Sequence, residues 1–211
     1  MSAIAEAPPF WEGSVRGFLH RPANTAGPGL VLTHGAGGNC NSPMLIAVAN
    51  AFQANGWWVL RCDLAFRQKR PFGPPSPATG AADRAGLKQA VARVRGMVPG
   101  DVYLGGHSYG GRQATMLAAE EPGLVAGLLL LSYPLHPPDK PQQLRTAHFP
   151  NLRTRAVFVH GTKDPFGTPE ELEAALKPIP APTRLITVDG AGHDLKKGRF
   201  DMQALTNLQI E

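Results

Sequence analysis

The segment GHSYG, residues 106–110, has the pattern G-x-S-x-G. A serine hydroxyl is a poor nucleophile at its ordinary pKa and needs a neighbouring base. The segment follows a strand-like stretch, 101–106, and precedes a helical stretch that Pro122 ends. A sharp turn between a strand and a helix is the setting in which such a serine becomes reactive. We therefore predict that Ser108 is a catalytic nucleophile; the alternative is a glycine-rich turn with a serine N-cap.

A nucleophilic serine needs a base, and the base needs an acceptor that orients it. His193 lies in a glycine-rich loop after the last predicted strand, and its ordinary pKa suits proton transfer near neutral pH. Asp164 follows the strand predicted at 156–160 and is the preferred acceptor. The order Ser108, Asp164, His193 is one in which such triads occur. Taken singly, His193 is compatible with a surface-loop histidine and Asp164 with an Asp-Pro turn. The weaker alternatives for the acid are Asp139 and Asp189, whereas Asp194 adjoins His193 and would point the wrong way in most loop geometries.

The negative oxygen that forms when a carbonyl is attacked needs two backbone N–H donors, an oxyanion hole. One donor is expected from Tyr109, and the other from the HGAGG loop at 34–38, where Ala36 is preferred and Gly37 is the alternative. The loss of one such donor costs about 3–4 kcal/mol. Alone, HGAGG also fits a glycine-rich connector. It lacks the Lys-Ser/Thr of a phosphate loop, and no cluster has metal-ligand spacing, so no cofactor and no metal are expected.

Short apolar runs alternate with helical stretches, which predicts a mostly parallel central sheet with helices on both faces. Strands are expected at 29–34, 58–64, 101–106, 124–133, 156–160 and 183–189, with a hairpin or edge strand at 10–20. Helices are expected from Ser42-Pro43 to Gly56, over 82–96, and from the sharp turn at Ser108, called the elbow below, to Glu121. Two more are expected after Thr168, with a capping box to Glu171, and at the C-terminus through Phe200, Ala204, Leu205 and Leu208. The loops 65–80 and 134–148 are long, but neither could form a separate cap domain.

Length and composition fit one domain spanning residues 1–211, with 43% apolar and 18% charged residues. The net charge of +5 is scattered and forms no basic stripe interleaved with aromatic residues, so no nucleic-acid partner is expected.

Cys40 and Cys62 form no CxxC pair, which favours free thiols in a reducing cytoplasm. The first residues do not resemble a signal peptide, and the longest apolar run, Leu124–Leu131, is far below the ~20 residues of a membrane span. The sequence does not predict an oligomeric state, and a homo-oligomer is compatible with it.

Five stretches together resemble the testis-expressed-protein-30-like family of α/β-hydrolases over roughly residues 13 to 200: HGAGG, GGHSYGGR, SYPLHPPDKPQQLRTAHF, HGTKDPFGTPEEL and GAGHD. That family is related to the dienelactone hydrolases and shares its domain with a subunit of a histone-acetyltransferase complex. The resemblance implies an α/β-hydrolase fold without a cap domain and a triad of Ser108, Asp164 and His193. Dienelactone hydrolases proper have a cysteine at the position of Ser108, and many family members have Arg-Ser-Met where this chain has His-Ser-Tyr.

These observations predict a serine esterase-type hydrolase that acts on a small ester or thioester through an acyl-enzyme. The alternative is a non-catalytic scaffold for protein contacts, which would need none of the three triad residues. The walls of the site are expected from the two long loops. The residues expected there are Phe66, Arg67, Lys69, Arg70, Phe72, Tyr133, Leu135, His136 and Phe149. The basic residues of the first loop could attract an acidic substrate, with solvated surface charge as the alternative.

Overall fold

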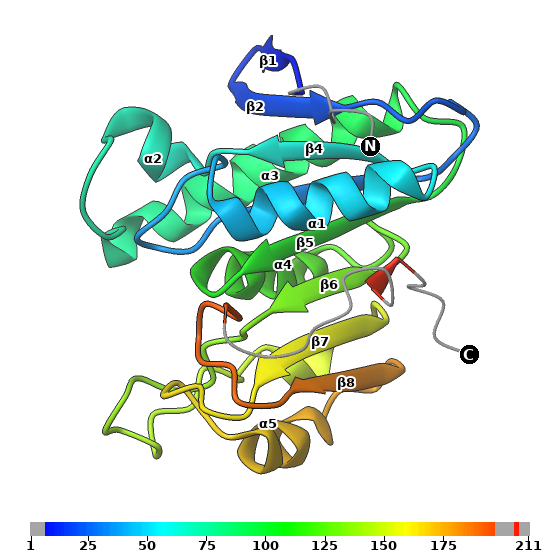
Figure 1. Ribbon diagram of the computed structural model, residues 1–211. Coiled ribbons are helices and arrows are strands. Elements are labelled where there is room, and N and C mark those ends of the chain that lie inside the picture. Colours follow the sequence, from blue (N-terminus) through cyan, green and yellow to red (C-terminus); the bar gives the residue numbers. More distant parts are fainter. Residues whose placement is uncertain (1–6, 197–204, 207–211) are drawn as a thin grey trace.

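The computed structural model describes residues 7–196 and 205–206, and within them eight strands form one sheet (Figure 1). The strand order is β1-β2-β4-β3-β5-β6-β7-β8. β1 and β2 form an antiparallel hairpin at one edge, β2 pairs antiparallel with β4, and the other pairs are parallel. The strands are β1 (Pro9–Glu12), β2 (Val15–His20), β3 (Gly29–Thr33), β4 (Trp58–Cys62), β5 (Val102–His107), β6 (Leu128–Leu131), β7 (Ala156–Gly161) and β8 (Thr183–Val188). The mostly parallel sheet predicted from the sequence is confirmed.

Helices cover both faces of this sheet. They are α1 (Pro43–Ala54), α2 (Ala65–Lys69), α3 (Gly80–Arg95), α4 (Tyr109–Glu120) and α5 (Pro169–Leu176), with 3-10 turns η1 (Pro77–Thr79) and η2 (Phe149–Asn151). In Figure 1, α1 lies in front of the sheet and α3 and α4 lie behind it. Successive residues of a strand point to opposite faces, so Leu30 and Leu32 join the core under α1, and Val31 joins the core under α3 and α4.

Two predicted elements differ from the structure. The strand expected at 124–133 is limited to β6: the chain turns at Gly123, where φ is +83°, and bends at Ser132, where φ is +51°. The loop expected at 65–80 contains α2 and η1. Its helix α2 is tied to α3 by the buried carboxylate of Asp83, which accepts the Phe66 N–H at 2.9 Å. The predicted C-terminal helix lies outside the described residues, apart from Leu205 and Thr206.

The predicted helix starts are confirmed. Thr168 caps α5 by accepting the Glu171 N–H at 3.2 Å, and the Glu171 carboxylate accepts the Thr168 N–H at 2.8 Å. Ser42 occupies the N-cap of α1 with Pro43 next, although its hydroxyl makes no capping hydrogen bond. A glycine with φ of +85°, Gly56, follows the end of α1, as expected for a helix C-terminus.

The strand order places one crevice in the sheet. β3 lies between β4 and β5, so the chain leaves the carboxyl end of β3 towards one side and the carboxyl end of β5 towards the other. Ligands of open α/β sheets bind at such a switch point. The backbones approach closely there: a Cβ atom on Gly110 would lie 2.5 Å from the carbonyl oxygen of His34. The last glycine of G-x-S-x-G is therefore a steric requirement of this packing.

Candidate active site

Ser108 occupies the sharp turn between β5 and α4. Its φ of 50° and ψ of −117° lie in a region that a non-glycine residue adopts only under strain. Although Ser108 is at the N-cap position of α4, its side chain makes no capping hydrogen bond. The hydroxyl Oγ instead lies 2.8 Å from Nε2 of His193. This geometry favours the nucleophile over the alternative of a simple serine N-cap.

The His193 imidazole lies between the serine and a buried carboxylate. Its Nδ1 is 2.8 Å from Oδ2 and 3.0 Å from Oδ1 of Asp164. The Asp164 side chain is 0% exposed, whereas the His193 side chain is 21% exposed. Oδ1 of Asp164 also accepts the N–H of Phe166 at 2.9 Å, which fixes the carboxylate. In this arrangement Nδ1–H donates to Asp164 and Nε2 is free to accept the serine proton.

The other candidate acids lie elsewhere. Asp139, Asp189 and Asp194 are all exposed. The Asp194 carboxylate pairs with Nζ of Lys196 at 3.3 Å, and the Asp189 carboxylate accepts the Thr162 hydroxyl at 3.3 Å. Of the four aspartates considered from the sequence, Asp164 is the one in contact with His193.

His107 and Phe166 contact His193 and its loop, and neither contact is predicted from the sequence. Nε2–H of His107 donates to the main-chain carbonyl of His193 at 2.9 Å, and burial lowers the pKa of His107 to about 4. The Phe166 ring lies 4.2 Å from the imidazole of His193, measured between centroids. The available signals were the position of His107 beside Ser108 and that of Phe166 beside Asp164, but neither specifies a contact partner.

His34 fixes the direction of the Ala36 amide. Nε2 of His34 accepts the N–H of Leu64 at 3.1 Å, so Nδ1 carries the proton and donates it to the Gly35 carbonyl at 2.8 Å. The N–H of Gly38 donates to the same carbonyl at 3.1 Å. In a trans peptide the C=O and the following N–H point in opposite directions. These two bonds therefore orient the Ala36 N–H, and Ala36 lines a cavity together with Ser108.

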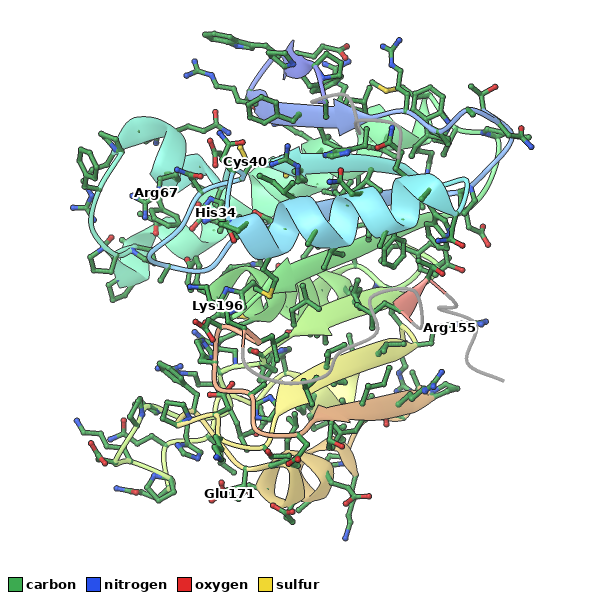
Figure 2. The ribbon with its side chains drawn as sticks, viewed as in Figure 1. His34, Cys40, Arg67, Arg155, Glu171 and Lys196 are labelled. Atoms are coloured by element: carbon green, nitrogen blue, oxygen red, sulfur yellow. The ribbon has the colours of Figure 1, made fainter. Side chains whose placement is uncertain are left out.

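Arg67 fixes the same loop from the other side. Its buried guanidinium donates from Nη2 to the Ala36 carbonyl and from Nε to the Gly38 carbonyl, both at 2.8 Å. It also donates to the carbonyls of Arg70 and Gly73, at 3.2 and 3.1 Å. Figure 2 shows Arg67 and His34 at the end of the sheet opposite Arg155, which immediately precedes β7. The sequence predicts Arg67 in the wall of the site, whereas the structure buries its guanidinium against backbone carbonyls.

Tyr109 contributes the first amide of α4, and the first amides of a helix have no acceptor within it. The Tyr109 hydroxyl donates to Oδ2 of Asp83 at 2.8 Å, which ties the elbow to α3. Burial, followed by this carboxylate, raises the pKa of Tyr109 to about 12. Tyr109 and Ala36 therefore flank Ser108 from the two loops of the switch point, where the sequence predicted the oxyanion donors.

Two cavities open at Ser108. The larger has a volume of about 530 Å³ and is lined by Pro74–Pro77, Pro134, Phe166 and three arginines, Arg84, Arg112 and Arg145. The smaller has a volume of about 340 Å³ and is lined by the 35–38 loop, His107, Phe166 and His193. The two long loops thus supply walls as predicted, but through other residues. Phe66, Arg67, Tyr133, Leu135, His136 and Phe149 are buried, and Phe72 is 82% exposed.

Three further observations on residues 7–196 and 205–206 concern metal ligands, thiols and membrane spans. No three His, Cys, Asp or Glu side chains there are grouped to hold a metal ion. Cys40 and Cys62 are free thiols as predicted, and burial raises the pKa of both, so their nucleophilic thiolates are disfavoured. The same part of the chain has no helix of the length and apolarity that a bilayer crossing requires.

This chain is similar to known α/β-hydrolase proteins over most of its length. A family model described as an alpha/beta hydrolase domain matches residues 26–209. A dienelactone hydrolase from Anabaena variabilis is 21% identical with a TM-score of 0.69, over 96% of this chain and 93% of that one. Est1E from Butyrivibrio proteoclasticus is 18% identical with a TM-score of 0.73, over 96% and 95%. A Xanthomonas campestris protein described as an α/β serine hydrolase without lid is 16% identical with a TM-score of 0.69, over 96% and 91%. At these identities the three structures show a common fold.

Proposed function

Because the chain belongs to the alpha/beta hydrolase domain family, we propose that it is a serine hydrolase that cleaves a small ester or thioester through an acyl-enzyme. One observation carries the proposal: hydrogen-bonding distances of 2.8 Å link Ser108 to His193 and His193 to the buried Asp164. A scaffold has no need of this arrangement or of the strained turn that presents the serine. Within the family, the five sequence stretches support a narrower place beside the testis-expressed-protein-30-like members.

The chemistry follows from these positions. Oγ of Ser108 attacks the substrate carbonyl while its proton moves to Nε2 of His193. The carboxylate of Asp164 stabilises the resulting imidazolium, and the N–H groups of Ala36 and Tyr109 hold the negative oxygen. His193 then returns the proton to the leaving oxygen or sulfur as the carbonyl re-forms. Water, deprotonated by the same imidazole, attacks the acyl-enzyme, and the second collapse releases the acid and restores Ser108.

Labelling with a fluorophosphonate probe tests the proposal directly, because the probe reacts with an activated serine hydroxyl. We expect one adduct, on Ser108, together with turnover of p-nitrophenyl acetate. Ser108→Ala should abolish both while the far-UV circular dichroism spectrum is unchanged. Ser14→Ala, in the turn of the β1–β2 hairpin, is the matched control and should retain both. A protein that gives no adduct and hydrolyses no ester would favour the scaffold.

A further inference from the structure

We propose that the acyl group taken by this enzyme carries a free carboxylate, which Arg112 and Arg145 bind in the larger cavity beside Ser108. The substrate class is then a monoester or monothioester of a dicarboxylic acid. The inference rests on the proposed hydrolase function and adds the identity of the acyl half.

Arg112 is the first part of the argument. It lies four positions after Ser108, its N–H donates to the Ser108 carbonyl at 3.0 Å, and both residues line the larger cavity. Its Nε is buried and has no hydrogen-bond partner. Within the described ranges, Arg112 also forms no ion pair with a carboxylate. A guanidinium that lines a cavity without a carboxylate partner attracts an anionic ligand there.

Arg145 brings a second cation to the same cavity from the loop after β6. Its backbone is fixed, because its carbonyl accepts the Tyr133 hydroxyl at 2.7 Å and its N–H donates to the Leu135 carbonyl at 2.8 Å. Its guanidinium donates only to the Pro134 carbonyl, at 3.3 Å, among the described residues. Burial and then repulsion from Arg112 lower the pKa of Arg145. Two guanidinium groups that repel each other across a cavity form a binding site for an anion.

Arg84, the third arginine of the larger cavity, already has a carboxylate partner within the protein. Nε of Arg84 pairs with the Glu120 carboxylate at 2.9 Å, and Nη1 donates to the Gln113 amide oxygen at 3.0 Å. Its charge is already compensated inside the protein. Near the other two, the pKa of His148 is lowered to about 4 by burial and then by Arg112 and Arg84, so His148 adds no charge at neutral pH. The uncompensated charge of the cavity is therefore that of Arg112 and Arg145.

The position of His193 assigns the carboxylate to the acyl half of the substrate. The imidazole must deliver its proton to the leaving group, so the leaving group lies on the side of His193. His193 lines the smaller cavity, together with the 35–38 loop, whereas both unpaired arginines line the larger one. With the leaving group in the smaller cavity, the acyl chain extends into the larger. The larger cavity has a volume of about 530 Å³ and is lined by Ser108 and both arginines, so a short dicarboxylic acyl chain such as glutaryl is the form to test.

The test compares p-nitrophenyl hemiglutarate with p-nitrophenyl 5-methylhexanoate, in which an isopropyl group replaces the carboxylate. We expect kcat/KM to be about 10- to 100-fold higher for the hemiglutarate, as for charge-assisted hydrogen bonds. Arg112→Gln should bring this ratio close to one, and Arg112→Lys should restore part of it. Arg153→Gln is the matched control, because Arg153 is exposed and precedes β7 at the opposite end of the sheet. It removes the same charge and should leave the ratio unchanged.

A wild-type ratio near one, with both esters hydrolysed, overturns the inference and leaves the hydrolase proposal intact. A ratio that Arg153→Gln lowers as much as Arg112→Gln overturns it too, because net charge then explains the preference. Binding gives a readout independent of turnover. Millimolar glutarate should raise the Tm of Ser108→Ala, and the rise should disappear in Ser108→Ala/Arg112→Gln. If the wild-type protein hydrolyses neither ester, the proposed hydrolase function is contradicted. If glutarate also fails to raise the Tm of Ser108→Ala, the anion site is overturned as well.

Discussion

Oγ of Ser108 and Nε2 of His193 lie 2.8 Å apart, although the two residues are separated by 85 positions in the chain. Each follows a parallel strand, β5 or β8, and parallel strands bring their carboxyl ends to one edge of the sheet. Asp164 follows β7, which lies between them in strand order, and so reaches His193 from the same edge. The sheet thus brings three side chains from separate loops within hydrogen-bonding distance of one another, and the following predictions test the roles proposed for them.

Asp164→Asn should lower kcat by about 10⁴-fold. The amide can donate to Nδ1 and so favours the tautomer of His193 with its proton on Nε2, which cannot accept the serine proton. The fold should persist, since the amide has nearly the shape of the carboxylate. Steady-state kinetics on p-nitrophenyl acetate measure the effect. Asp189→Asn and Asp194→Asn are the controls, because both side chains are exposed and turned to other partners. A mild effect of Asp164→Asn beside a severe one at either control would show that the acid is misassigned.

Arg67→Met should lower kcat by about 10- to 100-fold while KM changes little. The substitution removes the hydrogen bonds that hold the Ala36 and Gly38 carbonyls, and a displaced oxyanion donor weakens binding of the transition state more than that of the substrate. Arg67→Lys should recover little, because an ammonium group cannot reproduce the planar fork. Lys69→Met, at an exposed position of the same helix, should behave as wild type. An effect confined to KM would contradict a role in orienting the loop.

Stability should fall as the pH falls below neutral. Burial lowers the pKa of His20 and His107 to about 4, from an ordinary value of 6.5, so the folded protein keeps both neutral where the unfolded chain takes up protons. The full free energy of unfolding is therefore kept above about pH 6.5, and part of it is lost as the pH falls towards 4. Each histidine adds at most about 1.4 kcal/mol per pH unit. Urea midpoints from pH 7.5 to 4.5 measure the slope, which His20→Gln should reduce. An unchanged slope in that variant would show that His20 titrates normally.

Short acyl chains should be preferred. For p-nitrophenyl esters, kcat/KM should be highest at about two to six acyl carbons and should not rise further to palmitoyl. Each methylene gains roughly 0.8 kcal/mol only while it is buried against apolar atoms, and the larger cavity is lined in part by three arginines. Acetyl, butyryl, octanoyl and palmitoyl esters provide the series, measured below and above the concentration at which the longer esters form aggregates. A steady rise through palmitoyl would indicate a deep apolar tunnel.

The parts of the site that the sequence predicts are those set by local sterics or by strand ends. The elbow can be recognised from the sequence because Gly110 must be a glycine for α4 to approach the loop after β3. Asp164 and His193 are readable because each follows an apolar strand, although their catalytic roles stay predictions. The capping box at Thr168 is readable because its two hydrogen bonds join residues three positions apart.

The parts that could not be predicted depend on the path of long side chains. Arg67, Lys69 and Arg70 form one basic cluster in the sequence, yet Arg67 points inward to backbone carbonyls while Lys69 is exposed. Conversely, Arg112 and Arg145 are 33 positions apart and meet only because α4 and the loop after β6 share a cavity. Composition gives the number of charges, but burial and loop geometry decide which of them faces a ligand.

The guanidinium of Arg67 has one further consequence. Its Nη2 donates both to the Ala36 carbonyl and to the Gly73 carbonyl, and Gly73 directly precedes the prolines that line the larger cavity. One side chain therefore links the wall of the larger cavity to the loop from which an oxyanion donor is proposed. If both proposed roles hold, we expect replacement of Pro74 or Pro75 to change turnover together with acyl selectivity.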